Sequence, residues 1–428
     1  MHTRTAKALF TFGAKYRNKS LWPEYEKLKE SEWLTRSQLV DIQSHNAHRF
    51  LQFAKKHSPY YKKILGNLQF NPDNFTGTDS LKEIPTVTKT QLIEHNKAIH
   101  SNYHFKKCFT AETSGTSGNA LEFSKNEVWD SINRANMMRA YDWYGVKPWN
   151  RYGYFWGYNI APSQAYKTRL LDYLQNRFRL FKYDRASIEM FAEKLSTATF
   201  VAGYSSMVYE VAKMINELDI PKPNLKMVKG TSEMILDAYQ PAAIEAFGSK
   251  IVSEYGAAES GLIAFECPEG SMHINIENVI VETDADDEII ITNLASYSFP
   301  VIRYRLGDAV KLSDSDCACG RKHPVIKEVI GRKGSVVIGN NGSYPALTFY
   351  YVFKNLAIHN SILLNYKAVQ NNKGHVDIFI EGTQNCSYET EIYHELEKYF
   401  SDDVIFSVIF TSSFDKTLKK RQYFESKL

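Results

Sequence analysis

The sequence predicts an α/β protein, with a large multi-layer N-terminal domain of β-sheets flanked by helices and a small α+β C-terminal domain. Short apolar segments alternate with helical patterns up to about residue 262, which favours parallel strands covered by helices. The 428 residues exceed what one compact domain usually spans. Beyond Gly331 follow roughly 95 residues, a typical domain size. We therefore expect domains at residues 1–331 and 332–428.

The N-terminal part is predicted to be mainly helical. Between residues 20 and 70, apolar side chains recur at three- and four-residue steps, and Ser58-Pro59-Tyr60-Tyr61 interrupts the pattern. A short helix over Lys89–Asn96 is expected after Pro85, because Thr88 is a suitable N-terminal cap. A longer helix is expected over residues 124–144.

The remaining elements follow the change in periodicity. We expect strands at 199–204 and 225–230 on either side of a helix at 208–218. From 272 to 312 the pattern becomes β-strands, joined by the acidic turn at 284–287. The expected C-terminal elements are helices at 345–356 and 388–400 and strands at 364–369, 376–381 and 404–410.

Composition excludes several classes of protein. A hydrophobic content of 43% with 23% charged residues is ordinary for a globular protein, and a net charge of +4 argues against a nucleic-acid partner. No segment approaches the ~20 apolar residues of a transmembrane helix. Met1–Pro23 is basic without acidic residues, a composition that a transit peptide also has, and we expect a first helix that rests on the domain surface or on a membrane face. Five unevenly placed cysteines favour the reducing cytoplasm over a disulfide framework.

A run of small residues forms the most informative segment of the chain. It consists of Thr113, Ser114, Gly115, Thr116, Ser117 and Gly118. Glycines let the backbone approach a ligand, and successive N–H groups in such a loop form an anion-binding concavity. The loop lacks the Walker A pattern. A solvated linker is the alternative interpretation when the loop is taken alone.

Three further segments follow the loop: Glu254–Gly261, Arg303–Asp308 and Gly331–Gly334. In this order, the four segments resemble those of the adenylate-forming enzymes, and within them the phenylacetate–CoA ligase and CapK-like branch. The resemblance covers most of the chain. It implies an enzyme that binds ATP and Mg²⁺ and activates a carboxylic acid as an acyl-adenylate.

The resemblance assigns roles to the first two motifs. The 113–118 loop would grip the β- and γ-phosphates of ATP, although Asn119 stands where a lysine often follows. Glu259 would hold Mg²⁺, an oxygen-ligand role. Tyr255 would stack on the adenine, next to Gly256 and Ala257 of the same motif. Ala258 stands where a hydroxyl residue often occurs.

Other nucleotide contacts are implied downstream and upstream. Asp308 matches the carboxylate that accepts both ribose hydroxyls, and Arg332 matches an arginine that reaches ribose or phosphate oxygens. Glu233 resembles a residue of the turn beside the adenine, with a helix N-terminal carboxylate as the alternative. Gly334 stands where an acidic hinge residue is frequent, and glycine is compatible with a hinge.

The C-terminal domain carries the second implied catalytic residue. Lys416 resembles the lysine that bonds the reacting carboxylate and the α-phosphate, with Lys419 as second choice and a solvated basic tail as the alternative. The resemblance implies that this domain is mobile and rotates as a lid between two half-reactions, with a hinge around Gly331, Arg332 and Gly334.

An acyl pocket and a metal site complete the expectations. The resemblance places Trp156, Gly157, Tyr158, Gly203, Tyr204 and Ser205 near the substrate. Cys267, His273, Cys317 and Cys319 are candidate ligands of a structural Zn²⁺, because thiolates and imidazole suit this ion. His323 or Cys108 could replace one of the four, and buried reduced cysteines are the alternative.

The expected function is therefore an ATP-dependent acid ligase that passes the acyl group to coenzyme A. One alternative is an amide-forming ligase with an amine acceptor in capsule or O-antigen polysaccharide biosynthesis. A second is a non-catalytic nucleotide-binding protein. The acid and the oligomeric state stay open, with a homodimer as one candidate.

Overall fold

The structure is a computed structural model, and its described residues fall into two compact units. The described ranges are 2–75, 77–113, 120–155, 162–180, 185–218, 220–313, 315–332, 335–414 and 422–428, without the side chains of 162–165. Unit 1 consists of Met1–Asn150 and Ser253–Val329, and unit 2 of Arg151–Val252 and Ile330–Leu428. The later segment of unit 2 thus begins next to the predicted boundary at residue 331. The division into domains at 1–331 and 332–428 stays a prediction.

The helices of unit 1 begin where the sequence offers caps. Thr35 and Thr88 each form a capping box with a glutamine three residues later, and Pro59 occupies the first turn of its helix. The bounds are α1 Thr3–Arg17, α2 Leu21–Ser31, α3 Arg36–His57, α4 Pro59–Asn67, α5 Lys89–Glu94, α6 Asn96–Ile99 and α7 Glu127–Trp143, with short 3₁₀ helices at Pro72–Asn74 and Thr78–Glu83.

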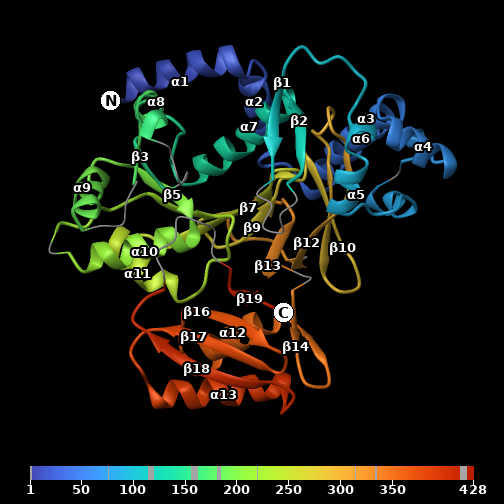
Figure 1. Cartoon of the computed structure of the whole chain (residues 1–428). Helices are drawn as coiled ribbons and strands as arrows, with labels where there is room; N and C mark the ends of the chain where they lie inside the picture. The colour runs from blue at the N-terminus through green and yellow to red at the C-terminus, as the bar shows by residue number, and fades with distance from the viewer. Residues whose placement is uncertain are drawn as a thin grey trace. The chain divides into compact units, whose positions relative to one another are not determined.

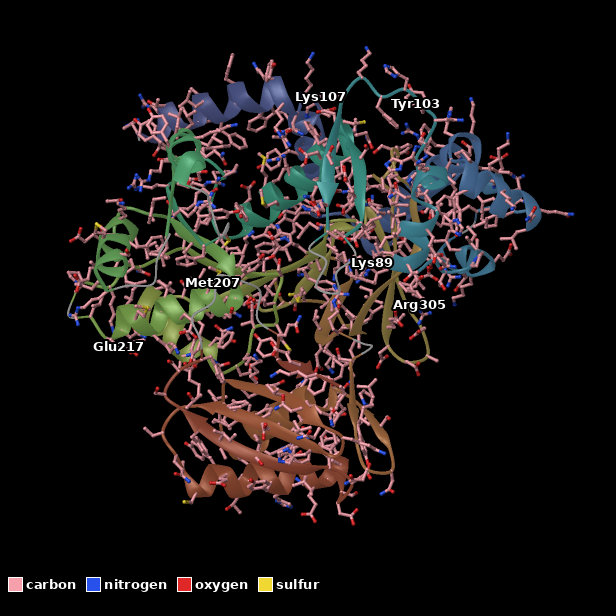
Figure 2. All side chains as sticks on the ribbon, viewed as in Figure 1. Lys89, Tyr103, Lys107, Met207, Glu217 and Arg305 are labelled. Atoms are coloured by element: carbon pink, nitrogen blue, oxygen red, sulfur yellow. The ribbon has the colours of Figure 1, made fainter. Side chains whose placement is uncertain are left out.

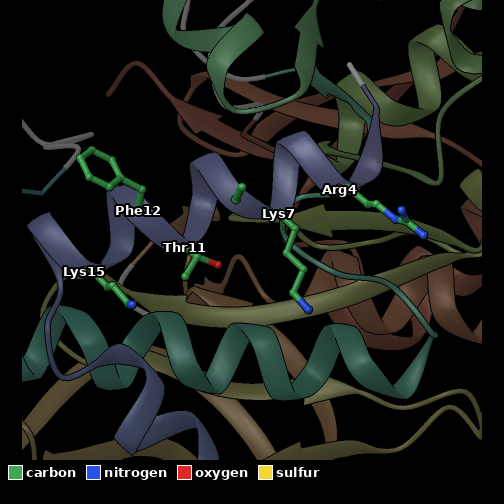
Figure 3. Close-up of a pocket in the computed structure, with 6 residues that line it drawn as sticks. Arg4, Lys7, Thr11, Phe12 and Lys15 are labelled. Carbon is green, nitrogen blue, oxygen red and sulfur yellow. The ribbon is translucent and has the colours of Figure 1, made fainter.

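The first helix carries the basic N-terminal segment. Ala6 and Ala14 are buried, and the Phe10 ring packs on Trp149 with 5.5 Å between centroids, so α1 rests on unit 1 as expected. Its outer face forms a hollow of about 420 Å³ that is lined by α1 residues alone (Figure 3). Its lining residues belong to none of the predicted nucleotide-binding segments, as far as the described residues extend. Within the described ranges, no helix combines the length and apolarity of a membrane span.

The strands of unit 1 follow the order β10-β11-β12-β13-β9-β8-β7 (Figure 1), and the pairs β10/β11, β11/β12, β13/β9, β9/β8 and β8/β7 are antiparallel. The bounds are β7 Ile251–Ala257, β8 Gly261–Glu266, β9 Met272–Ile274, β10 Val279–Thr283, β11 Glu288–Asn293, β12 Val301–Ser313 and β13 Val325–Arg332. A separate hairpin consists of β1 (Cys108–Glu112) and β2 (Glu122–Asn126). The residues before Glu127 therefore form a strand, and the helix predicted over 124–144 begins later than expected.

Unit 2 contains the parallel strands that the alternating pattern predicts. β3 pairs with β4 and β5, and β5 pairs with β6, all in parallel. Their bounds and those of their helices are β3 Tyr152–Phe155, α8 Pro162–Leu174, β4 Arg177–Arg179, α9 Arg185–Leu195, β5 Phe200–Tyr204, α10 Ser205–Asn216, β6 Met227–Thr231 and α11 Tyr239–Phe247. Met207 and Glu217 mark the two ends of α10 in Figure 2.

The C-terminal segment of unit 2 has its own sheet, in the order β18-β17-β16-β19. Its elements are β14 Val336–Ile338, β15 Ser343–Pro345, α12 Thr348–Asn360, β16 Tyr366–Asn372, β17 His375–Glu381, α13 Cys386–Phe400, β18 Ile405–Thr411 and β19 Phe424–Ser426. The rings of Phe349 on α12 and Phe400 on α13 stack at 5.3 Å, so the two helices pack on each other. The predicted α+β segment is confirmed.

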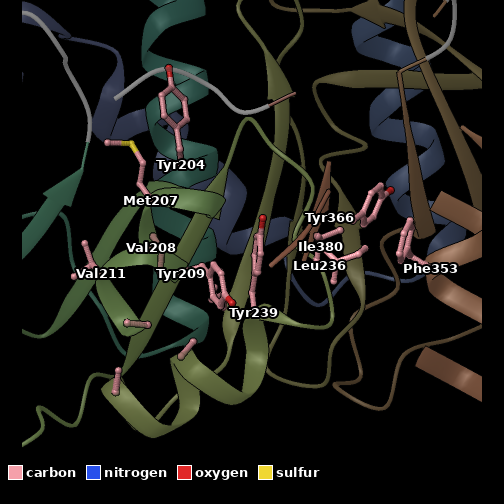
Figure 4. Close-up of a cluster of buried hydrophobic side chains, with 14 of the residues drawn as sticks. Tyr204, Met207, Val208, Tyr209, Val211, Leu236, Tyr239, Phe353, Tyr366 and Ile380 are labelled. Carbon is pink, nitrogen blue, oxygen red and sulfur yellow. The ribbon is translucent and has the colours of Figure 1, made fainter. Parts of the chain in front are cut away.

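One apolar core runs through unit 2. Tyr209 of α10 stacks on Tyr239 of α11 at 4.3 Å, and Phe353 of α12 stacks on Tyr366 of β16 at 3.7 Å (Figure 4). The Tyr239 hydroxyl lies 3.0 Å from that of Tyr423, which joins the two sequence segments. Removal of these rings from water is the main contribution to the stability of this core.

Candidate active site

In the sequence, the paired strands β1 and β2 stand on either side of the Ser/Thr/Gly loop. The Thr113 N–H donates to the Leu121 carbonyl at 3.0 Å, and the Leu121 N–H donates to Thr113 Oγ1 at 2.9 Å. These two bonds close the loop between residues eight positions apart. Ser114, Gly115, Thr116, Ser117 and Gly118 lie outside the described residues. The hairpin thus holds the ends of the predicted phosphate-binding loop close together.

Glu259 lies in the connection between β7 and β8 and is almost fully buried, with 5% of its surface exposed. The Tyr304 hydroxyl donates to Glu259 Oε1 at 3.1 Å, and the Asn293 side chain donates to the Glu259 carbonyl at 3.0 Å. The turn itself is closed by a bond from the Ala257 N–H to Ser260 Oγ at 2.9 Å. The carboxylate is therefore held in one place. Such a fixed carboxylate is a better metal ligand than one on a freely moving surface side chain.

Asp308 and Tyr255, both predicted to contact the nucleotide, contact each other in unit 1. The Tyr255 hydroxyl donates to Asp308 Oδ2 at 2.9 Å. Asp308 lies on β12, four positions after Tyr304, the residue that bonds Glu259. One strand thus connects to both ends of the 255–259 motif. Tyr304 belongs to the segment Arg303–Asp308, yet the sequence did not predict it as the partner of Glu259.

Gly256 has no space for a side chain. A Cβ there would lie 2.3 Å from the Gly261 carbonyl oxygen and 3.1 Å from Leu262 Cα, both on the backbone of β8. The pairing of β7 with β8 shifts register at this position. The glycine therefore allows the close strand approach that sets the 257–260 turn and Glu259.

We expect Gly256→Ala to lower the free energy of unfolding by about 1–3 kcal/mol, because the backbone of β8 would have to move. The predicted adenylation should fall with it, since Glu259 would be displaced. Gly66→Ala is the matched control, because a Cβ at that position meets open space. Thermal unfolding of both variants checks this, and equal melting temperatures would contradict it.

The other predicted site residues lie in unit 2 or outside the described residues. Gly203, Tyr204 and Ser205 occupy the end of β5 and the start of α10. A Cβ on Gly203 would lie 2.5 Å from Phe155 Cβ, so this glycine serves strand packing. Arg332 ends β13 and is exposed. Trp156, Gly157, Tyr158, Gly334, Lys416 and Lys419 lie outside the described residues.

Glu233 contacts the first turn of α10. Its Oε2 accepts the Ser206 N–H at 2.9 Å, and its carbonyl accepts Ser205 Oγ at 3.1 Å. A carboxylate at a helix N-terminus is favourable because it faces the unpaired N–H groups and the positive end of the dipole. Glu233 therefore is a helix N-terminal carboxylate, the alternative left open by the sequence, and its contact with adenine stays a prediction.

Four candidate metal ligands converge in unit 1. One ligand atom from each of Cys267, His273, Cys317 and Cys319 lies within 4.8 Å of all the others. The Cys267 and Cys317 sulfurs are 3.7 Å apart, and Cys319 Sγ is 3.2 Å from His273 Nε2. This convergence includes neither Cys108, which is exposed, nor His323.

The environment of these ligands fits a bound cation. Burial raises the pKa of the Cys267 thiol to about 12 and lowers that of His273 to about 4. The imidazole is therefore held in its neutral, ligating form, whereas the thiol needs a metal to be stable as a thiolate. His273 Nδ1 lies 3.3 Å from the His323 carbonyl, an interaction that orients the ring. Three thiolates and one imidazole are a donor set typical of structural zinc.

A buried charged network lies beside this cluster and was not predicted. Glu277 forms an ion pair with Arg139 at 2.5 Å, and His323 Nε2 lies 3.1 Å from the same carboxylate. The Ser31 hydroxyl also donates to it, at 2.6 Å. Although burial alone raises the pKa of Glu277, the charges of Arg139 and His323 hold it well below its usual value. The carboxylate is thus ionised inside the protein.

Comparisons with known proteins identify relatives of the chain. The chain is 21% identical to protein CapK of Staphylococcus aureus over 327 residues, which cover 73% of the chain and 71% of CapK. It is 23% identical to the phenylacetate-coenzyme A ligase of Thermus thermophilus over 344 residues, or 72% of the chain and 74% of that ligase. The chain is related to the adenylate-forming enzymes. No family model matches it.

The fold of the chain agrees with that of a solved structure. A 2-hydroxyisobutyryl-CoA ligase in the postadenylation state, in complex with R3-HIB-AMP, has a TM-score of 0.73 against the chain at 14% identity. The match covers 93% of the chain and 92% of that ligase. The predicted fold class is confirmed by this agreement in fold.

Proposed function

We propose that the protein is an ATP-dependent ligase that activates a carboxylic acid as its acyl-adenylate and transfers the acyl group to an acceptor, with coenzyme A as the first candidate. The observation that carries the proposal is the joint placement of two carboxylates by β12: Tyr304 bonds Glu259, and Asp308 bonds Tyr255. Relationship to a phenylacetate-coenzyme A ligase supports the thiol acceptor.

The chemistry proceeds in two displacements. A carboxylate oxygen of the acid attacks the α-phosphorus of ATP, the bond to the bridging oxygen breaks, and pyrophosphate leaves with the electron pair. The acceptor thiolate then attacks the acyl carbon, and AMP leaves. Neither step needs a covalent enzyme intermediate, so the protein acts by positioning and by electrostatic stabilisation.

Each described residue has a proposed part in the first step. Glu259 would hold Mg²⁺, which neutralises charge on the departing pyrophosphate. Asp308 would exchange its bond from Tyr255 for the ribose hydroxyls, since a carboxylate can accept both. The freed Tyr255 ring would then lie along the adenine. Arg332 and the 113–118 loop would contact the remaining phosphate and ribose oxygens.

The amine acceptor is the second candidate, and relationship to CapK supports it. A test of both uses the product. The protein is incubated with Mg·ATP, a panel of acids, and either coenzyme A or amino sugars, and products are identified by mass spectrometry. We expect AMP together with an acyl-thioester. An amide product would favour the second candidate, and no AMP with any acid would favour a non-catalytic nucleotide-binding protein.

Lys416 lies outside the described residues, and its proposed role rests on the sequence. A lysine that contacts the acid and the α-phosphate serves the first displacement only. We expect Lys416→Ala to slow acyl-adenylate formation by about 10²–10³-fold while transfer from supplied acyl-adenylate continues. Single-turnover assays of the two half-reactions measure this, with Lys419→Ala as the matched variant. Equal loss in both half-reactions would give Lys416 a structural role, and a defect in Lys419→Ala alone would move the role there.

We also propose that Cys267, His273, Cys317 and Cys319 bind one structural Zn²⁺. Because such a site exists in the folded protein and not in the unfolded chain, metal binding adds to the free energy of unfolding. Chelation should therefore lower the melting temperature. Elemental analysis should find zinc in the wild type and in Cys108→Ser, whose thiol is exposed, but not in Cys317→Ser. Wild-type protein prepared without chelators that contains no zinc would contradict the proposal.

The zinc ligands need reduced thiols, which is why we retain the cytoplasm as the proposed location. The homodimer stays a prediction.

A further inference from the structure

The segment that contains the phosphate-binding loop is poor in positive charge. Between Lys107 and Lys125 the sequence has no lysine or arginine, whereas it has Glu112 and Glu122. A triphosphate brought to this loop therefore needs a cation from another position. The first one along the chain is Lys125, on β2 of the hairpin that holds the loop.

Lys125 is held in an unusual environment. Its ammonium lies 5.2 Å from the ring centroid of Trp129 and 5.5 Å from that of Phe123, and these two rings stack on each other. Among the described residues it has no hydrogen bond or ion pair. Burial lowers the pKa of Lys125, while the charges of Asp130 and Glu259 act in the opposite direction and that of Arg134 adds to the lowering. Cation–π contacts compensate only part of the lost hydration.

The rings under Lys125 adjoin the turn that carries Glu259. Asn133, one helical turn after Trp129 on α7, accepts the Leu262 N–H at 2.7 Å. A Cβ on Gly261 would lie 3.9 Å from Trp129 Nε1, and this buried indole nitrogen has no hydrogen-bond partner among the described residues. The ammonium, the indole N–H of Trp129 and the Glu259 turn therefore border one region of unit 1.

We propose that Lys125 binds the polyphosphate group of ATP beside Glu259. The inference rests on the proposed function and adds the cation that the loop lacks. A phosphate oxygen would give the ammonium the charged partner that the described residues do not provide, and the aromatic rings would keep the side chain oriented before ATP arrives.

The test compares Lys125→Met with Lys107→Met. Methionine preserves the apolar contact with the rings and removes the charge. Lys107, directly before β1, is the matched control (Figure 2): its ammonium also lies over rings, 5.3 Å from Tyr16 and 5.5 Å from Phe109, but it donates to the Tyr16 carbonyl at 3.0 Å. Dissociation constants for Mg·ATP, inorganic pyrophosphate and AMP are measured by calorimetry, with melting temperatures alongside.

We expect Lys125→Met to bind Mg·ATP and pyrophosphate about 10- to 100-fold more weakly, as the loss of a charge-assisted contact requires. AMP affinity should stay near the wild-type value, and Lys125→Arg should recover part of the ATP affinity. The melting temperature of Lys125→Met should be equal to or above that of the wild type, because a desolvated charge is removed. Lys107→Met should bind all three ligands like the wild type.

Two results would overturn the inference while leaving the proposed function intact. One is a wild-type protein that forms acyl-adenylate while Lys125→Met binds ATP and pyrophosphate unchanged. The other is a Lys125→Met variant that loses AMP as strongly as ATP and melts at a lower temperature, which would indicate a structural role. A wild-type protein that binds neither ATP nor pyrophosphate would overturn the proposed function together with the inference.

Discussion

Replacement of Glu259 by glutamine should lower the rate of acyl-adenylate formation by about 10²–10³-fold or more, the usual effect of removing one preorganised electrostatic group from a site. Glutamine keeps the size of the side chain and can still accept the hydrogen bond from Tyr304. It loses the negative charge that a magnesium ligand requires. The fold should therefore persist while the chemistry fails.

The control for this variant is Glu122→Gln, which removes a charge from an exposed position of the same unit. Circular dichroism and thermal unfolding should be unchanged in both variants. Pyrophosphate release should be lost only in Glu259→Gln, and excess Mg²⁺ should restore little of it. Full activity of Glu259→Gln at ordinary Mg²⁺ concentrations would remove Glu259 from the metal site.

Replacement of Glu277 by glutamine should have the largest effect on stability. Glu277 and Arg139 are both buried, at 4% and 1% exposure, and the variant leaves the guanidinium without its counter-charge. Breaking a buried ion pair in this way costs about 3–5 kcal/mol. Because His323 contacts both Glu277 and the zinc-ligand candidate His273, metal affinity should fall as well.

The stability effect of Glu277 should depend on pH in a defined direction. Since the pKa of Glu277 is lowered in the folded protein, its contribution is fully present above the unfolded pKa, about 4.3, and is lost as the pH falls through the folded value. Denaturant titrations at pH 7 and at lower pH measure the difference between wild type and Glu277→Gln. Glu189→Gln, in an exposed pair with Arg185, should show little change at any pH. A Glu277→Gln protein as stable as the wild type at pH 7 would contradict this account.

The periodicity and the motifs of the sequence were sufficient to predict the fold class and several local features. The capping signal at Thr88 and the strand periods between residues 199 and 231 correspond to observed elements. The convergence of Cys267, His273, Cys317 and Cys319 was also expected, because a Cys–x–Cys pair and a Cys/His pair are recognisable donors. These features depend on local propensity or on a distinctive residue type.

Features that depend on tertiary contacts were not predicted. The partners of Glu277 come from segments far apart in sequence, and nothing local marks Arg139 as buried. The bond between Tyr304 and Glu259 requires β12 to approach the turn before β8. Glu122–Asn126 became a strand because it pairs with Cys108–Glu112, which overrides the helical pattern that continues from residue 127. Pairing between distant segments decides each of these cases.

Exchange of labelled pyrophosphate into ATP is the direct test of the proposed ligase activity, because it reports reversible acyl-adenylate formation without any acceptor. The assay is run with the wild type, Glu259→Gln and a panel of carboxylic acids. We expect exchange in the wild type that depends on both the acid and Mg²⁺, and no exchange in Glu259→Gln. Absence of acid-dependent exchange across aliphatic, hydroxy and aromatic acids, in protein that binds ATP, would contradict it and identify a nucleotide-binding protein without ligase activity.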